Sequence, residues 1–180
     1  MNRRARGFTL IEAVIVMLIA ATLLAIAVPA WSNAMAAAHN AAARTALAGS
    51  LLDAVRRSAL TGGEVVMCPD TGAARCKGGV DWSGGWIVFA DPNGNRTREA
   101  SETVLQQIEA LEGGVRVRTT TGRTRLVFQP NGGNAGSNVT FTLCDGRGVN
   151  RATTLVLAND GRLRQAKPGA AAAQACVYGS

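Results

Sequence analysis

The sequence predicts an α+β fold in which one long N-terminal helix precedes a domain of short strands. Three observations predict it. The first 60 residues contain a long apolar run and then an alanine-rich segment without turn signals. Beyond residue 63, short β-favouring runs alternate with clusters of Gly, Asn, Asp and Pro. The chain has 180 residues, of which 47% are apolar, which suits one ordinary domain plus an additional element.

The N-terminus predicts a helix that enters a membrane. Three arginines stand before Gly7, and Glu12 is the only formal charge between residues 8 and 43. Residues 13–30 are almost wholly apolar, and about 20 such residues cross a hydrocarbon layer of ~30 Å. The arginines predict that the N-terminus stays in the cytoplasm and that the rest of the chain is exported. A cleaved secretory signal, with a cut site near residues 34–38, and a plain signal anchor are alternatives, but neither accounts for a costly carboxylate in the apolar run.

These residues resemble a known signal. The string Gly7-Phe8-Thr9-Leu10-Ile11-Glu12, with its basic leader and apolar sequel, resembles the N-terminal signal of type IV pilins and type II secretion pseudopilins. The resemblance implies that a prepilin peptidase cuts after Gly7 and methylates the amine of Phe8. It also implies that Glu12 pairs with the N-terminal amine of a neighbouring subunit, which would neutralise its charge in a lipid-like bundle. The alternative for Glu12 is an acid at a helix start that interacts with the helix dipole.

The helix is expected to continue well past the apolar run. Residues 33–60 are rich in alanine, and Leu47, Leu51 and Val55 recur at helical spacing. Pro29 should kink or loosen the helix, and Thr61-Gly62-Gly63 should end it. The expected organisation is a leader over 1–7, a transmembrane and assembly helix over 8–31, an amphipathic second half over 32–62 and a periplasmic β domain over 63–180.

Eight strands are expected in the β domain. The string Asn159-Asp160-Gly161 between two of them is typical of a hairpin, and Asp91-Pro92-Asn93-Gly94-Asn95 is taken as a turn. The run Ala170 to Ala173 is a low-complexity patch. The expected strands are Glu64–Cys68, Trp86–Ala90, Thr103–Ile108 (which also fits a helix), Val115–Thr119, Arg125–Gln129, Asn138–Cys144, Thr153–Ala158 and Arg162–Gln165.

This domain is similar to the GspH/FimT-type minor pseudopilins. The resemblance rests on Cys68-Pro69-Asp70 with Cys76, on the string from Trp82 to Asp91 (WSGGWIVFAD), and on Gly161-Arg162-Leu163-Arg164. It implies a type IV pilin-like fold, in which the helix packs on an antiparallel β domain of two small sheets. It also favours Trp82, Trp86 and Phe89 as core aromatics over a base-stacking or sugar-stacking role.

The four cysteines fit an oxidising compartment. Sequence order suggests that Cys68 pairs with Cys76 and Cys144 with Cys176, although three connectivities exist. A zinc site is less favoured, because there is no Cys-x-x-Cys and the single histidine falls in the helix. We therefore expect no metal and no cofactor. No nucleophile–base pair or Gly-x-Ser-x-Gly string is present in the sequence, so we do not expect an enzyme.

Positive charge gathers in the last third of the chain. Residues 114–180 contain nine basic and two acidic residues, whereas residues 8–113 contain seven basic and ten acidic residues. Arginine binds phosphate in a bidentate manner, and three pairs with i, i+2 spacing would share a strand face. Such a face predicts DNA binding without sequence readout. The basic residues are Arg116, Arg118, Arg123, Arg125, Arg147, Arg151, Arg162, Arg164 and Lys167.

Two functions from different classes follow. In the first, the chain is a minor pilin of a type IV pilus that binds double-stranded DNA for natural transformation, and Gly161 to Arg164 resembles the C-terminal motif of the DNA-associated FimT-like branch. In the second, it is a minor pseudopilin of a type II secretion system with a structural role and no DNA binding. In both, its partners are other pilin subunits and prepilin peptidase. We expect a single-pass inner-membrane protein with a periplasmic domain, which becomes extracellular within a pilus.

Overall fold

A computed structural model describes residues 9–70, 72 and 74–179. Gly7 and Phe8, the predicted processing residues, lie outside the described residues. The chain divides into two compact units, Met1–Met35 and Ala36–Ser180, and helix α1 (Leu10–Thr61) contributes to both. This helix confirms the predicted one to within two residues at its start and one at its end.

In the first unit, α1 is an apolar helix whose side chains face outward. Residues 9–35 are all exposed, and the helix continues through Pro29, although proline has no N–H to donate to the carbonyl four residues before it. The side chain of Thr9 caps the helix start, because its Oγ1 accepts a hydrogen bond from the Glu12 amide at 3.4 Å. The helix is long and apolar enough to cross a membrane.

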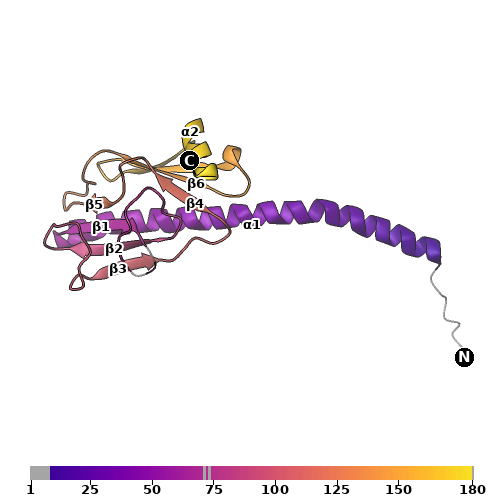
Figure 1. Cartoon of the computed structure of the whole chain (residues 1–180), viewed down its shortest axis with the longest axis horizontal. Helices are drawn as coiled ribbons and strands as arrows, with labels where there is room; N and C mark the ends of the chain where they lie inside the picture. The colour runs from indigo at the N-terminus through magenta and orange to yellow at the C-terminus, as the bar shows by residue number, and fades with distance from the viewer. Residues whose placement is uncertain (1–8, 71, 73, 180) are drawn as a thin grey trace, which may run out of the picture. The chain divides into compact units, whose positions relative to one another are not determined.

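The second unit contains two antiparallel four-stranded sheets (Figure 1). The first sheet has the order β3-β2-β1-β5 and the second has the order β4-β6-β7-β8. The expected strands differ from the observed ones by at most one residue at either end, and the ambiguous segment is a strand. The first sheet comprises β1 (Glu64–Pro69), β2 (Trp86–Asp91), β3 (Val104–Ile108) and β5 (Leu126–Phe128); the second comprises β4 (Arg116–Thr119), β6 (Val139–Cys144), β7 (Thr153–Leu157) and β8 (Leu163–Ala166).

Two short helices complete the unit. A 3₁₀ turn, η1 (Val149–Arg151), precedes β7, and α2 (Ala170–Tyr178) follows β8. The interpretation of residues 170–173 as a low-complexity patch missed α2. Alanine has the highest helix propensity, and Gly179 ends the helix in the left-handed conformation that glycine adopts readily.

The second half of α1 contributes one face to the core. Leu47, Leu51 and Ala54 are fully buried, in one cluster with side chains from both sheets. Burial of each leucine contributes about 1.5–3 kcal/mol. The aromatic residues Trp82, Trp86 and Phe89 are also fully buried, which confirms their role in the core.

Two disulfides are present, Cys68–Cys76 and Cys144–Cys176, as sequence order suggested. The first ties the end of β1 to the loop that follows it. The second ties β6 to α2, and α2 lies beside β6 in Figure 1. A helix of nine residues is marginal by itself in water, so this bond holds α2 against the sheet.

Candidate nucleic-acid interface and assembly helix

Glu12, the predicted assembly residue, lies in the first turn of α1. The carboxylate of Glu12 is exposed and has no hydrogen bond or ion pair with any other described residue. Around it, Leu10, Ile11 and Ile15 are also exposed, with Leu10 84% accessible. An apolar surface with one carboxylate needs partners from outside the chain, either lipid or other helices.

Two of the predicted DNA-binding arginines are held by carboxylates. Arg147 donates to both oxygens of the buried Asp145, at 2.8 and 2.7 Å, and Asn40 on α1 donates to the same carboxylate at 2.8 Å. The hydrogen bond from Arg147 holds the pKa of Asp145 below its usual range. Arg162 makes a more exposed pair with Asp160 at 2.6 Å. These pairs reduce the charge that either arginine presents to a phosphate.

Three further arginines hold the fold through backbone carbonyls. Arg118 donates to the Ala175 carbonyl at 3.0 Å and so binds the C-terminal end of α2. The half-buried Arg123 donates to the Ala135 carbonyl at 3.1 Å, and burial lowers the pKa of its guanidinium. Arg125 donates to the carbonyl of Arg96. These three arginines keep their charge, but their side chains are fixed by hydrogen bonds to the backbone and are less free to turn toward a phosphate.

The remaining cations are exposed. Arg116, Arg151, Arg164 and Lys167 have no side-chain hydrogen bond or ion pair among the described residues. Two of them, Arg151 and Lys167, line a groove of about 690 Å³ together with Arg44 and Arg147. The groove lies between the second half of α1, η1 and the start of α2. Ala166, on the same face of β8 as Arg164, also lines it.

Arg44 is the residue that sequence reasoning missed. It stands in the alanine-rich helix, more than 100 positions before Arg151, in a part of the chain with net negative charge. The groove brings the two together. Arg44 follows Asn40 by four residues, so the two side chains lie on the same side of α1. Asn40 contacts Asp145, which places that side of the helix against the basic C-terminal segment.

The basic residues do not form one continuous face. Arg116 and Arg118 on β4 and Arg164 on β8 point to the same side of the second sheet, but from opposite edges. Three strand spacings place these edges about 14 Å apart. α2 covers part of the face between them, because Cys176 contacts the Thr142 carbonyl and is bonded to Cys144. The groove side therefore brings together the half-buried Arg44 and the exposed Arg151, Arg164 and Lys167.

Comparisons with known proteins agree with this architecture. The GspH family of type II transport proteins matches residues 37–161, and the prokaryotic N-terminal methylation motif matches residues 2–28. No curated protein matches the chain.

Three solved structures share the fold. A crystal structure of the type IV minor pilin FimU of Pseudomonas aeruginosa is 15% identical, with a TM-score of 0.52, over 72% of this chain and 93% of that one. A second crystal form of FimU is 13% identical, with a TM-score of 0.53, over 76% and 90%. The minor pseudopilin EpsH from the type 2 secretion system of Vibrio cholerae is 13% identical, with a TM-score of 0.52, over 73% and 98%.

Proposed function

Since the chain belongs to the GspH family, whose members are structural pilin and pseudopilin subunits and not enzymes, we propose that it is a minor pilin of a type IV pilus that binds DNA without sequence preference. Pilin-family proteins assemble with other pilins and are processed by prepilin peptidase. The apolar first half of α1 and the methylation motif are those of a membrane-anchored pilin.

For assembly, we propose cleavage after Gly7, so that the mature chain begins at Phe8. Glu12 then pairs with the N-terminal amine of a neighbouring subunit, because both charges would otherwise stand unpaired in an apolar bundle. The second unit lies in the periplasm before assembly and outside the cell in the pilus. There it presents the basic groove to solvent.

The observation that carries DNA binding is the unpaired charge around the groove. Arg44, Arg151 and Lys167 surround a cavity wide enough for a phosphate, and Arg164 lies beside it. Backbone phosphates would exchange their condensed counterions for these side chains, which gives affinity without base recognition. The pilus machinery, not this chain, would supply the work of uptake.

The test is a fluorescence-anisotropy titration of a 25-base-pair duplex with the full chain in non-ionic detergent. With three phosphate contacts, affinity should fall about 40-fold between 50 and 200 mM salt. Arg164→Gln/Lys167→Gln should weaken binding at least about tenfold and flatten the salt slope by nearly two. Arg75→Gln/Lys77→Gln is the matched control, since it removes the same charge from two exposed residues elsewhere. Equal losses in the two double variants would refute a groove-centred site.

The second candidate function is a minor pseudopilin of a type II secretion system that does not bind DNA. It is favoured by the pairing of Arg147 and Arg162 with carboxylates and by the shared fold with EpsH. A deletion strain separates the two. Loss of natural transformation with intact protein secretion supports the pilus, and the reverse supports the secretion system.

A further inference from the structure

The connection between β2 and β3 carries oxygen ligands at a recognisable spacing. Residues 91–102 form a twelve-residue segment that begins with Asp91-x-Asn93-x-Asn95 and ends with Glu102. Calcium loops use side-chain oxygens at positions 1, 3 and 5, a glycine at position 6, a backbone carbonyl at position 7 and a bidentate glutamate at position 12. Here Arg96 stands at position 6 in place of glycine and adopts the left-handed conformation, with φ 59°. We propose that residues 91–102 form a Ca²⁺-binding site, with Asp91, Asn93, Asn95, the Thr97 carbonyl and Glu102 as ligands.

The two outermost carboxylates each have a buried oxygen without a partner. Asp91 is 1% exposed and Glu102 is 7% exposed. Asp91 Oδ1 and Glu102 Oε1 are buried and accept no hydrogen bond from any described residue. A buried carboxylate oxygen is costly unless a donor or a cation satisfies it, so these two atoms are suited to bind a cation.

Strand pairing brings these carboxylates together. Phe89 pairs with Val104, and the Ala90 amide donates to the Thr103 carbonyl at 3.0 Å. Continued past the start of β3, this register would set Asp91 opposite Glu102. Facing residues on antiparallel strands project to the same side of the sheet. On this register both carboxylates belong to one side of the sheet at the base of the loop, where two like charges need compensation.

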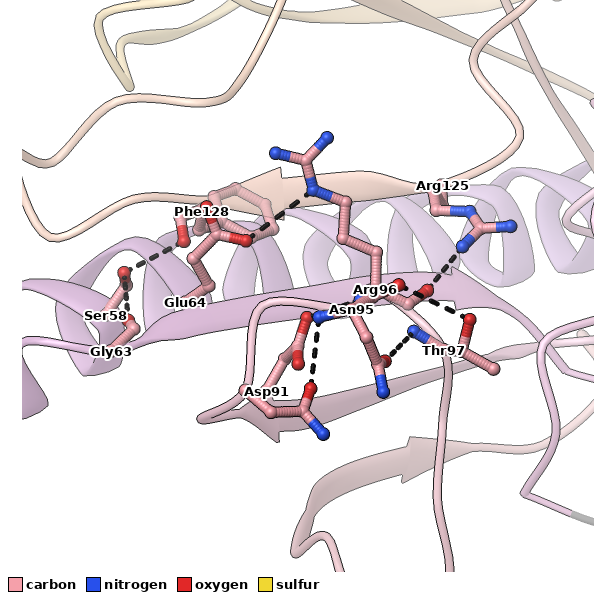
Figure 2. A network of polar contacts seen from close by, with 10 residues as sticks. Ser58, Gly63, Glu64, Asp91, Asn95, Arg96, Thr97, Arg125 and Phe128 are labelled. Carbon is pink, nitrogen blue, oxygen red and sulfur yellow. Dashed lines mark hydrogen bonds and ion pairs between the residues drawn. The ribbon is translucent and has the colours of Figure 1, made fainter.

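A third carboxylate extends this row. Glu64 on β1 pairs with Asp91, and its partner in the structure is Arg96, whose Nε lies 3.6 Å from Glu64 Oε2 (Figure 2). Arg96 thus compensates Glu64 from the outer end of the row. The Asp91 and Glu102 oxygens stay without such compensation.

The loop backbone already directs Asp91 inward. Asp91 Oδ2 accepts a hydrogen bond from the Arg96 amide at 2.8 Å, as Figure 2 shows. Asn93 Oδ1 accepts from the Asn95 amide at 3.0 Å, and Asn95 Oδ1 accepts from the Thr97 amide at 2.7 Å. One oxygen of Asp91 is therefore fixed by the loop and the other is left for a ligand.

The ligand set favours calcium over other metals. Within the described residues no three His, Cys, Asp or Glu side chains are placed to hold a metal by themselves, so the amide and backbone oxygens must contribute. All of these ligands are oxygens, which excludes the nitrogen and sulfur chemistry of zinc sites. Glu102 Oε2 accepts a hydrogen bond from the Glu99 amide at 2.8 Å, so the five residues supply five oxygens. A mixed, adaptable set of this kind, completed by water, suits Ca²⁺ better than the rigid octahedral Mg²⁺.

The test is isothermal titration calorimetry of the full chain in detergent, freed of metal with a chelator and titrated with CaCl₂. We expect one Ca²⁺ per chain with a dissociation constant of about 10⁻⁴–10⁻³ M, as for extracellular calcium modules. Glu102→Gln and the charge-preserving Glu102→Asp should each weaken binding at least about tenfold. Glu109→Gln, which changes an exposed carboxylate just after β3, should leave it unchanged. Near-UV circular dichroism of the buried tryptophans checks that each variant is folded.

A second measurement keeps the proposal falsifiable if a variant unfolds. Ten millimolar Ca²⁺ should raise the melting temperature of the unmodified chain, and Mg²⁺ at the same concentration should raise it less. The absence of both binding heat and a melting-temperature shift with Ca²⁺ would overturn the proposed site. Unaltered Ca²⁺ binding in both Glu102 variants would also overturn it. Arg98 provides the competing account, because its Nε is buried without a hydrogen-bond partner among the residues that the structure describes. If Ca²⁺ has no effect and Arg98→Gln lowers the melting temperature as much as Glu102→Gln, the row is an internal ion pair and not a calcium site.

Discussion

Removing the Cys144–Cys176 disulfide should destabilise the chain more than removing Cys68–Cys76. The two bonds close segments with sequence separations of 32 and 8 residues. In the chain-entropy model, the longer closure contributes about 3.7 kcal/mol to the free energy of unfolding and the shorter about 2.5 kcal/mol. At about 3 °C per kcal/mol for a domain of this size, replacing each pair by alanine lowers the melting temperature by about 11 °C and about 8 °C respectively.

Part of the stability lost without the Cys144–Cys176 disulfide should come from the detachment of α2. α2 contributes two buried residues, Ala173 and Cys176, and its last turn is bound by Arg118. Without the disulfide, a nine-residue helix with so little burial should detach from the second sheet. Backbone amides of α2 should then exchange with solvent at rates close to those of an unfolded peptide.

The assay is thermal unfolding of the two double-alanine variants in the same detergent, together with hydrogen exchange followed by mass spectrometry. The Cys68→Ala/Cys76→Ala variant is the control, because it should leave α2 protected. If the Cys144→Ala/Cys176→Ala variant melts no lower than the control, the entropy of loop closure does not determine how much each disulfide stabilises the chain. If α2 stays protected in it, packing alone holds the helix.

Two further predictions concern single positions. Gly85 has φ +97°, and a Cβ there would lie 2.1 Å from the Ile108 carbonyl oxygen, so Gly85→Ala should cost more than about 3 kcal/mol by thermal unfolding. Gly84→Ala is its control, since the nearest atom to its Cβ is 3.6 Å away, and comparable losses would contradict the steric argument. The pKa of Asp145 is lowered in the folded chain by Arg147, so its stabilising effect is complete above the unfolded pKa and is lost as pH falls through the folded one. The melting temperature should therefore fall more steeply below about pH 4 in the parent than in Asp145→Asn; parallel curves would remove Asp145 from the acid response.

Local patterns were sufficient to predict most of the fold. Turn signals bounded every strand, and the uncharged run with Glu12 indicated the helix. α2 could not be predicted, because an alanine-rich segment of nine residues has no amphipathic pattern and depends on a disulfide partner 32 positions away. The order of the strands in each sheet depends on long-range pairing, such as that of β1 with β5, which no local pattern contains.

The candidate site was less predictable for the same reason. The basic composition identified the cations, but only the fold shows that Arg147 is held by a buried carboxylate while Arg151 is not. Arg44 joins the groove from a distant part of the sequence. From the sequence, the string from Asp91 to Asn95 was interpreted only as a turn. Its proposed role depends on Glu102, which lies just before β3 and which the β2–β3 register, if continued, sets opposite Asp91.

The second half of α1 also needs a means of fixing its position on the sheets. An alanine-rich helix offers a smooth face that could pack in several registers. Three buried polar residues on it contact defined partners: Asn40 contacts Asp145, Ser50 accepts from Trp86 Nε1 at 3.0 Å, and Ser58 donates to the Phe128 carbonyl at 2.9 Å. A shift by one turn would break all three bonds and leave buried polar groups unsatisfied. We infer that these contacts specify the register, while the leucines between them supply the burial that makes it stable.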